Sequence, residues 1–519
     1  MNRSIMDWPT FYGALVLLIA VALPLVLFPD WGQAVVTGAN EMVSGNFGVL
    51  YLLVGMVLFI FLLYIAFSRY GRIVLGSRES KAEFNTITWA AMLFAAGIGS
   101  SIMYWGTIEW AFYYQDPPFG AEPGSTEAIE WATTYGLFHW GPIAWAIYCL
   151  PAIPIAYFFY VRKRPVLKVS EACRPILKHH TDGWLGTVVD VLFMFGLLGG
   201  AGTTMALATP LIGAGFTHFT GIEAGMGVYA VILVIATAIF GVSAYTGLRR
   251  GIRVLSNVNF WLSVVLLGFI FIVGPTVFLS NTMMNSIGML ADNFFRMGMW
   301  SEPFRNMGPF EQTGFPQDWT IFYWAWWLVY APFVGLFVAR ISRGRSIREM
   351  VLGTLIYGTT GCLLYFGILG NFGLYLELSG QYSVVDTMNN VSPEAAIIGT
   401  VAQVPLSGLF VLIFVLLAVI FLATTFDSGS YILASVCQKY IDDEPERWNR
   451  LFWAVVLATP SAVLMFLGGL ETLQTASIVG GFPLIFIMAM LAYSFTKAVK
   501  EDMPNSFGQK YYIYREDLD

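Results

Sequence analysis

The chain has few charged residues for its length, and this scarcity already excludes most soluble proteins. Of 519 residues, 12% are Asp, Glu, Lys or Arg and 57% are hydrophobic, whereas about a quarter of a soluble domain is charged. Polar linkers of the kind that join soluble domains are also missing. The composition is therefore typical of a membrane protein. The net charge of −6 excludes the basic surface that nucleic-acid binding needs.

Cysteine and histidine are equally scarce. The four cysteines show no CxxC spacing and the four histidines are scattered, so we expect neither a disulfide framework nor a metal centre built on these side chains. The first apolar run follows Arg3 directly and has no small-residue cleavage site, which excludes a cleavable secretory signal. Because no nucleophile, base and metal ligands converge, we expect no enzyme activity and no cofactor.

Long apolar runs are abundant instead. Runs of about 20 apolar residues are long enough to cross a bilayer as α-helices. The sequence contains twelve of them, near residues 11–28, 47–67, 87–110, 137–160, 185–215, 225–245, 256–280, 319–339, 350–373, 407–435, 451–469 and 474–496. The sequence therefore predicts an all-α integral membrane protein with twelve transmembrane helices, and the lipid bilayer is its first partner.

Basic residues predict how these helices are oriented. If the twelve runs alternate across the membrane, 25 of the 27 Lys and Arg residues lie on one side, and only Arg296 and Arg305 lie on the other. Cytoplasmic loops carry an excess of Lys and Arg. We therefore expect both termini in the cytoplasm and a multi-pass location in the plasma membrane, which in a bacterium is the inner membrane.

Three acidic residues lie inside the predicted spans, at Glu109, Asp190 and Asp427, and a fourth, Glu471, lies between the ends of the last two spans. An ionised side chain near the bilayer centre costs about 2.5–3.5 kcal/mol or more, so each is a candidate functional residue. Glu109 and Glu471 lie near span ends, where water also reaches a side chain, and a structural role stays open for both.

Small residues interrupt two of the spans. Gly97 and Gly99 lie in the middle of the span at 87–110, and Pro332 lies in the span at 319–339. Unwound backbone at membrane depth lines cavities, and its free carbonyls and amides bind cations and carboxylates. We therefore expect both spans to be broken, and we take Gly97 and Gly99 as candidate binding residues.

The two interrupted spans occupy corresponding places if the chain contains two inverted five-helix repeats. The third helices of these repeats then carry one threonine pair each: Thr203 with Thr204, and Thr424 with Thr425. The predicted parts of the chain are two helices outside the repeats at 1–86, a first repeat at 87–280, an extracellular amphipathic connector at 281–317, a second repeat at 318–498 and a cytoplasmic tail at 499–519.

Aromatic residues are concentrated in the span at 319–339. Tyr323, Trp326, Trp327 and Tyr330 share one helical face by their i, i+3, i+4 and i+7 spacing. A quaternary ammonium group has no N–H to donate, so a site can offer its charge only the faces of aromatic rings, each worth about 0.5–2 kcal/mol. This face is therefore a candidate cation-binding cage.

A second aromatic group lies in the span at 137–160 and consists of Trp140, Trp145 and Tyr148. Tryptophan and tyrosine also collect at the two membrane interfaces. An interfacial belt combined with core packing is therefore the alternative interpretation of both groups.

These segments resemble the betaine/choline/carnitine transporter family over nearly the whole chain. The strongest matches are the stretches FYWAWW and ARISRGRSIRE between Phe322 and Glu349, FHWGPIAWAIY from Phe138 to Tyr148, PPFG from Pro117 to Gly120, and the Gly-Ile-Gly break. The resemblance implies twelve spans with two inverted five-helix, LeuT-like repeats, and a homotrimer.

The resemblance also implies particular substrate contacts. The family's aromatic box falls on Trp326, Trp327, Tyr330 and, to complete it, Tyr113. Positions on the substrate path of the sodium-coupled betaine carriers fall on Trp140, Trp145 and Tyr148, and family tryptophans near the access route fall on Trp319 and Trp324.

Sodium sites are implied in the same way. One matches Phe421, Thr424 and Thr425, opposite the backbone of Ala96. The symmetry-related second site consists of Thr203, Thr204 and Phe333. Sodium prefers hard oxygen ligands such as hydroxyls and carbonyls. The alternative is that the threonine hydroxyls only donate to carbonyls of their own helices.

The chain departs from the carnitine/γ-butyrobetaine exchangers, which it resembles around PPFG and LATPL. Those exchangers carry an arginine where Asn259 stands, a methionine where Val334 stands and a glutamine where Phe333 stands. Because the fixed cation is missing, the sequence favours sodium-coupled uptake of a zwitterionic trimethylammonium compound such as glycine betaine or carnitine. Sodium-independent exchange, an amino-acid substrate and a sulfonium analogue remain alternatives.

Overall fold

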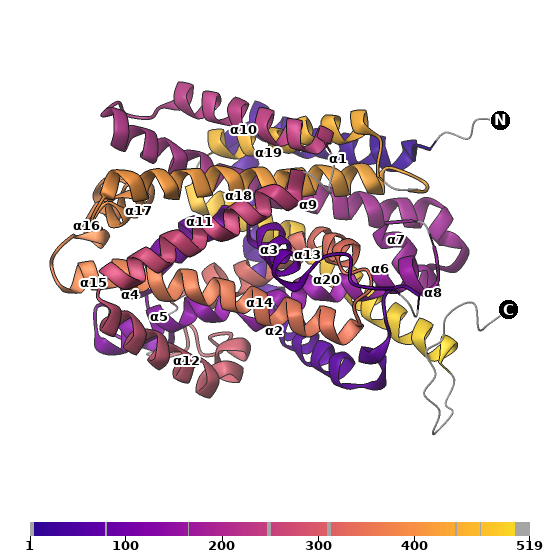
Figure 1. Cartoon of the computed structure of the whole chain (residues 1–519), viewed down its shortest axis with the longest axis horizontal. Helices are drawn as coiled ribbons and strands as arrows, with labels where there is room; N and C mark the ends of the chain where they lie inside the picture. The colour runs from indigo at the N-terminus through magenta and orange to yellow at the C-terminus, as the bar shows by residue number, and fades with distance from the viewer. Residues whose placement is uncertain are drawn as a thin grey trace.

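The chain folds into a bundle of helices. The computed structural model describes residues 5–77, 80–164, 166–246, 251–308, 313–441, 444–467 and 469–503, and in these residues the only β-structure is two isolated bridges. Most of the long helices run side by side along the longest axis of the molecule (Figure 1). The helices in chain order are α1 (Trp8–Leu27), α2 (Pro29–Phe67), α3 (Thr86–Ile98), α4 (Ser101–Gln115), α5 (Thr126–His139), α6 (Pro142–Ala156), α7 (Val169–Ala172), α8 (Arg174–Leu177), α9 (Trp184–Thr220), α10 (Met226–Thr246), α11 (Gly251–Val273), α12 (Thr276–Met299), α13 (Phe322–Ile341), α14 (Ile347–Tyr365), α15 (Asn371–Leu378), α16 (Val384–Asn390), α17 (Pro393–Val401), α18 (Ser407–Val436), α19 (Arg447–Leu467) and α20 (Gly469–Asp502).

Helices of transmembrane length confirm the predicted fold class. Among the described residues, nine helical stretches are long and apolar enough to cross a bilayer. Two further predicted spans coincide with shorter apolar stretches, Trp8–Pro24 and Thr86–Ala95, and the span at 451–469 lies largely in α19. The all-helical membrane fold is confirmed, whereas the count of twelve spans and the two inverted repeats stay predictions.

The parts of the chain outside the repeats are only partly described. Helix α12 covers most of the predicted connector at 281–317 and packs against α5 and α2. Helix α20 continues to Asp502, beyond the predicted end of the second repeat. The predicted tail at 499–519 lies outside the described residues from 504 onward.

Apolar side chains also cover the outside of the bundle. Large hydrophobic residues are strongly exposed on several helices, for example Val57 on α2, Val234 on α10 and Ile272 on α11. Soluble monomers rarely expose apolar surface on this scale. The exterior therefore matches a bilayer environment.

Helix α13 forms the centre of the core. Every residue from Trp319 to Ala339, which covers most of this helix, is buried. The helix packs against α6, α9 and α20, and its label lies near the middle of the bundle in Figure 1. A helix that is apolar on every side is stable only in such an interior position.

The predicted break in the third span is confirmed. Helix α3 ends at Ile98 and α4 begins at Ser101. Gly99 between them has φ of +59°, a left-handed conformation that favours glycine. A Cβ atom at Gly99 would lie 2.5 Å from Thr425 Oγ1 on α18, so the break also needs glycine for its close approach to α18.

The predicted break at Pro332 is wrong. Helix α13 runs without interruption through this proline, which removes only one backbone N–H from its hydrogen-bond ladder. Packing keeps the helix intact, because a Cβ atom at Gly335 would lie 2.6 Å from Pro151 Cβ and 2.9 Å from Ala152 N on α6. The two helices therefore touch at backbone distance just beyond the proline.

The second interruption lies in the predicted span at 137–160 instead. Helix α5 ends at His139, and α6 begins at Pro142 after Trp140 and Gly141. A Cβ atom at Gly141 would lie 2.3 Å from the Leu137 carbonyl oxygen, and Pro142 begins the next helix in the first position, where no N–H is needed. The sequence Gly-Pro thus marks the break.

The distribution of basic residues leads to a test of membrane orientation. All four native cysteines are buried, so a cysteine introduced at an exposed loop position becomes the reactive one. We expect Glu122→Cys to react with a membrane-impermeant maleimide added outside intact cells, and His179→Cys to react only after the membrane is opened. External labelling of His179→Cys at the rate of Glu122→Cys would overturn the predicted topology.

Candidate functional site

Five aromatic rings, three of them on α13 itself, form a cluster in the core of the bundle. We call Trp140, Tyr148, Trp326, Trp327 and Tyr330 the inner aromatic cluster. Trp326 and Trp327 stack with ring centroids 5.0 Å apart and an interplanar angle of 12°. The rings of Trp140 and Tyr148 meet Trp327 edge-on, at centroid distances of 4.8 and 5.5 Å. All five rings are buried, which excludes an interfacial belt for them.

Hydrogen bonds orient two of these rings. The Trp327 indole donates through Nε1 to the His139 carbonyl oxygen at 2.9 Å, which is one of the last carbonyls of α5. The break after His139 leaves such carbonyls without a partner in their own helix. The Tyr330 hydroxyl donates to the Gly200 carbonyl oxygen at 2.9 Å and is also hydrogen-bonded to Thr204 Oγ1.

Two polar atoms of the inner aromatic cluster lack a partner. Trp326 Nε1 and the Tyr148 hydroxyl are buried and have no hydrogen bond to any described residue. Native structures pair nearly all buried polar atoms. Unpaired donors of this kind are what a polar group of a bound ligand, or a water molecule, satisfies.

The break in the third span reaches this cluster through Gly97. A Cβ atom there would lie 2.9 Å from the Trp145 ring and 3.6 Å from the Tyr148 ring. Trp145 in turn stacks with Phe94 of α3, with centroids 6.4 Å apart. Glycine therefore allows the end of α3 to lie directly against the aromatic rings of α6.

A buried carboxylate on α4 is hydrogen-bonded to α13 and to Trp140 in the break after α5, beside the inner aromatic cluster. Glu109 accepts hydrogen bonds from the Tyr113 hydroxyl at 2.5 Å, from Trp140 Nε1 at 3.0 Å and from the Tyr323 hydroxyl. His139 Nδ1 lies 3.8 Å from the same carboxylate. The sequence identified Glu109 as a candidate but gave no partners for it. The spacing of Glu109 and Tyr113, four residues apart on one helical face, is the signal that it offered.

Two predicted substrate contacts lie elsewhere. The Tyr113 ring contacts Trp319 at a centroid distance of 4.8 Å and Phe315 at 5.2 Å, so Tyr113 reaches the inner aromatic cluster through Glu109. Trp324 points away from the cluster toward α2, where a Cβ atom at Gly55 would lie 2.9 Å from its Nε1. The structure therefore does not bring Trp324 together with the other predicted contacts.

One threonine of each predicted pair reaches the break in the third span. Thr425 Oγ1 donates to the Ala95 carbonyl oxygen at 3.5 Å, and Thr204 Oγ1 accepts from Ser101 Oγ at 3.4 Å. The other members donate to their own helices, Thr424 to Phe421 at 2.9 Å and Thr203 to Gly199 at 3.2 Å. Each pair thus places one hydroxyl at the break and turns one hydroxyl back on its own helix.

The phenylalanines predicted beside these threonines lie next to aromatic partners. The Phe421 ring is 6.1 Å from Phe94, and the Phe333 ring is 6.0 Å from Tyr330. Ala96 is part of α3, but its side chain is outside the described part of the structure. Asn259, on α11, is buried, and neither atom of its amide has a hydrogen-bond partner among the described residues.

Two of the other candidate acidic residues, Asp427 and Asp190, bind partners outside this site. Asp427 accepts a hydrogen bond from Ser243. Asp190 accepts from the backbone N–H of Ser170 at 2.9 Å and from its hydroxyl at 2.7 Å. Glu471 lies in α20, and its side chain is outside the described part of the structure.

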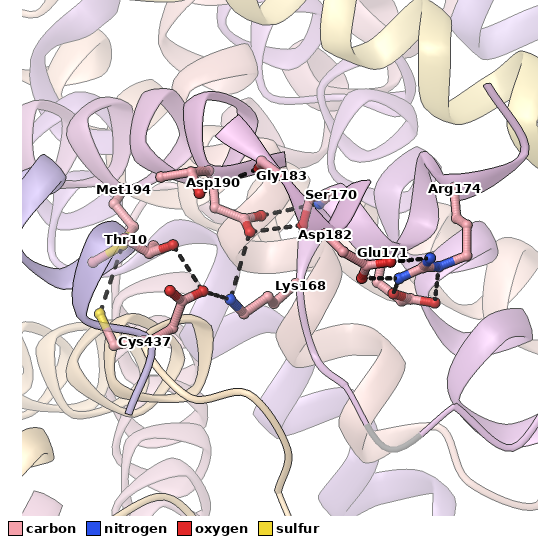
Figure 2. Close-up of polar contacts among 12 residues, drawn as sticks. Thr10, Lys168, Ser170, Glu171, Arg174, Asp182, Gly183, Asp190, Met194 and Cys437 are labelled. Atoms are coloured by element: carbon pink, nitrogen blue, oxygen red, sulfur yellow. Dashed lines mark hydrogen bonds and ion pairs between the residues drawn. The ribbon is translucent and has the colours of Figure 1, made fainter. Parts of the chain in front are cut away.

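A buried lysine joins Asp190 to the N-terminal segment (Figure 2). Lys168 forms an ion pair with Asp7, directly before α1, and lies 3.8 Å from Asp190 on α9. Thr10 of α1 donates to Asp7 at 3.0 Å. The side chain of Lys168 is 10% exposed, and those of Asp7 and Asp190 are 18% and 2% exposed. Lys168 therefore balances two carboxylates that have little contact with water. This network fastens α1 to α9.

A second ion-pair group lies beside this network in Figure 2. Arg174 donates to both carboxylate oxygens of Glu171, at 2.8 and 2.7 Å, and to both of Asp182, at 2.9 and 2.6 Å. These hydrogen bonds hold the pKa of Asp182 below its usual value. The forked guanidinium thereby closes the loop between α7 and α9.

The helical fold, the apolar exterior and the enclosed aromatic cluster define a multi-pass membrane protein with a buried group of aromatic side chains in its core. Comparison with known proteins narrows this class. A family model described as "BCCT, betaine/carnitine/choline family transporter" matches residues 9–504. The chain therefore belongs to the betaine/carnitine/choline family of transporters and is a transporter, not an enzyme.

Individual relatives agree with this assignment. The chain is 34% identical to the "Probable glycine betaine transporter" of Desulfitobacterium hafniense, over 93% of this chain and 97% of that protein. It is 33% identical to the "Uncharacterized transporter YeaV" of Escherichia coli, over 85% of this chain and 90% of that protein. Among solved structures, a Na⁺-coupled sialic acid symporter matches with a TM-score of 0.46 and 14% identity, over 87% of this chain and 86% of that one.

The Lys168 network leads to a prediction on stability. We expect Lys168→Met to lower the free energy of unfolding by about 3 kcal/mol, because it leaves the Asp7 and Asp190 carboxylates buried without their cation. Thermal unfolding of the purified protein in detergent measures this effect. Lys178→Met, which removes an exposed lysine of the same loop, is the control and should unfold like the parent. Equal unfolding temperatures for all three proteins would contradict the proposed role of the network.

Proposed function

We propose that the protein is a secondary active transporter that takes up a zwitterionic quaternary-ammonium compound of the glycine betaine or carnitine type together with Na⁺. The observation that supports this proposal is the inner aromatic cluster of five buried rings, of which Tyr148 lies against the broken third span at Gly97. Broken helices next to a buried site are typical of carriers that work by alternating access.

The aromatic rings match the cationic end of such a substrate. Stacked Trp326 and Trp327, with Trp140 set edge-on to them, present several π faces and few charged groups. A trimethylammonium group cannot donate a hydrogen bond, and aromatic faces are its recurrent partners in proteins. A primary ammonium group would instead need acceptors that this face does not provide.

The unpaired polar atoms match the anionic end. Trp326 Nε1 and the Tyr148 hydroxyl are donors without a described partner at the same cluster, and a substrate carboxylate accepts hydrogen bonds from such groups. The "Probable glycine betaine transporter" relative supports the same substrate class. A sulfonium analogue has the same two ends, so direct binding competition with it belongs in the substrate test.

Hydroxyl and carbonyl oxygens at the break support sodium as the coupling ion. Thr425 Oγ1 lies 3.5 Å from the Ala95 carbonyl oxygen, and the hydroxyl of Ser100 is buried without a described partner. Hard oxygen ligands of this kind suit small hard cations. Thr424, Phe421 and the backbone of Ala96 complete the proposed first site, and Thr203, Thr204 and Phe333 form the proposed second one.

Sodium also replaces a missing fixed charge in this proposal. The position where the related exchangers carry an arginine is Asn259, which is buried and neutral. A mobile cation at the break would then stabilise the substrate-bound state. We further propose that the chain forms a homotrimer in the plasma membrane with both termini in the cytoplasm, which rests on the family resemblance and the distribution of basic residues.

The first functional prediction concerns the aromatic cage. Trp327→Leu removes a π face but keeps an apolar side chain, and we expect it to weaken glycine betaine binding by about 1–2 kcal/mol, roughly five- to thirtyfold in Kd. Isothermal titration of the protein in detergent with saturating Na⁺ measures this change. Trp324→Leu is the matched control on the opposite side of the same helix and should bind like the parent. Unchanged binding by Trp327→Leu would leave the cluster with a packing role alone.

The second functional prediction concerns coupling. In liposomes we expect uptake of labelled betaine to depend on an inward Na⁺ gradient and not on K⁺, and substrate affinity to rise with Na⁺, because two ligands that favour one conformation raise each other's affinity equally. Thr424→Ala combined with Thr425→Ala should abolish this dependence, whereas Thr354→Ala, at a buried threonine that donates to a carbonyl of its own helix, should not. Asn259→Arg should partly relieve it. Equal uptake in Na⁺ and K⁺, driven only by substrate preloaded inside, would establish exchange instead.

A further inference from the structure

Glu109 is a fully buried acidic residue that forms no ion pair with a lysine or arginine in the described part of the chain. Its side chain is 0% exposed, and the basic group within 4 Å of it is the imidazole of His139. Burying a carboxylate in this way is costly unless hydrogen bonds and a cation compensate it. The hydrogen bonds are present, so the remaining question is which cation responds to the charge.

The imidazole does not bind the carboxylate directly, because its Nδ1 lies 3.8 Å from Glu109 Oε1. The Tyr113 hydroxyl donates to Glu109, so its oxygen accepts from His139 Nδ1, 2.9 Å away. His139 Nε2 is hydrogen-bonded to Thr320 Oγ1 at 3.0 Å. Both ring nitrogens therefore face hydroxyl groups, and the direct partners of the carboxylate are hydroxyl and indole donors.

Two of the side chains that bind Glu109 belong to or border the inner aromatic cluster. Trp140 donates its indole N–H to Oε2 of Glu109 and lies 4.8 Å from Trp327. Tyr323 donates its hydroxyl to the same oxygen and stacks on Trp327 at 5.5 Å and 26°. The carboxylate therefore lies directly behind rings that face the site.

A donor that is hydrogen-bonded to an anion becomes more electron-rich, because adjacent hydrogen-bonded groups polarise one another in a medium of low dielectric constant. For an indole or a phenol, the added electron density lies on the ring, whose negative face attracts cations. The charge of Glu109 thereby extends through Trp140 and Tyr323 to the binding surface. A ligand whose head group has the same shape but no positive charge gains nothing from this charge.

We propose that Glu109 determines the selectivity of the site for a positively charged head group, acting through Trp140 and Tyr323 without touching the substrate. This inference rests on the proposed function and deepens it. Glu109 is thus a positioning residue whose charge matters as well as its hydrogen bonds. A merely structural role, in which Glu109 only holds α4 against α13, requires the hydrogen bonds but not the charge.

A pair of ligands separates these two roles. Glycine betaine and tert-butylacetate, the anion of tert-butylacetic acid, have the same shape and the same carboxylate. In tert-butylacetate a carbon atom replaces the ammonium nitrogen, so its head group has no charge. The Kd of tert-butylacetate divided by the Kd of glycine betaine measures how strongly the site prefers the charged head group. It is determined for the full-length protein in detergent at saturating Na⁺ by quenching of tryptophan fluorescence.

Glu109→Gln keeps the size of the side chain and removes its charge. We expect it to raise the Kd of glycine betaine about tenfold and to leave the Kd of tert-butylacetate within about twofold, so that the ratio collapses. Asp190→Asn, which removes a buried carboxylate of a different network, is the matched control and should keep the parental ratio. An equal rise in both constants, or no rise in either, would show that the charge plays no part in selectivity.

Two further variants keep the inference testable if Glu109→Gln does not fold. Glu109→Asp retains the charge and should retain the parental ratio even where both ligands bind more weakly. Tyr323→Phe keeps the ring but loses its link to the carboxylate, and should lower the ratio about threefold. Loss of the ratio in Glu109→Asp together with a parental ratio in Tyr323→Phe would overturn the inference.

The failure of this inference can be distinguished from the failure of the proposed function. A parent protein that binds neither glycine betaine nor carnitine would overturn the proposed function. A parent that binds glycine betaine, with variants that keep the parental selectivity, would overturn this inference alone.

Discussion

The close packing of α13 is the constraint on which the rest of the structure depends. Every residue of its aromatic stretch is buried, and glycines on the neighbouring helices make this possible. A Cβ atom at Gly200 would lie 2.9 Å from the Tyr330 ring, and one at Gly481 would lie 2.9 Å from the Ala325 carbonyl oxygen. Since close-packed interiors respond to a change of even one methylene, the rings of α13 are held in defined orientations.

Helix ends supply the polar contacts that this packed core needs. The break after α5 frees the His139 carbonyl for the Trp327 indole, and the break between α3 and α4 brings Ser101 to Thr204 and Ala95 to Thr425. Two pieces of irregular backbone thus meet the same aromatic cluster from different sides. Under the proposed function, substrate and sodium both contact the broken third span, so each ligand favours the conformation that the other one needs.

The network around Lys168 differs in character from this site. It consists of ion pairs that connect three parts of the chain: the start of α1, α9, and the loop that precedes α7. The site around Glu109 instead contains one carboxylate, and its hydrogen-bond donors are aromatic side chains. The first arrangement neutralises its charges internally and fixes helices to one another. The second leaves a negative charge to act on the rings beside it, which is why we assign selectivity to Glu109 and stability to Lys168.

The sequence by itself determined the membrane class, the break at Gly99 and the aromatic face shared by Tyr323, Trp326, Trp327 and Tyr330. These properties depend on the length of apolar runs, on the conformational freedom of glycine and on the period of one helix, all of which are local. Only the tertiary structure decided that α13 continues through Pro332, that Trp324 faces α2, and that Glu109 binds Tyr113 of α4, Trp140 after α5 and Tyr323 of α13. Each of these outcomes depends on which helix lies opposite, and residues far apart in the chain do not encode that neighbour in their own spacing.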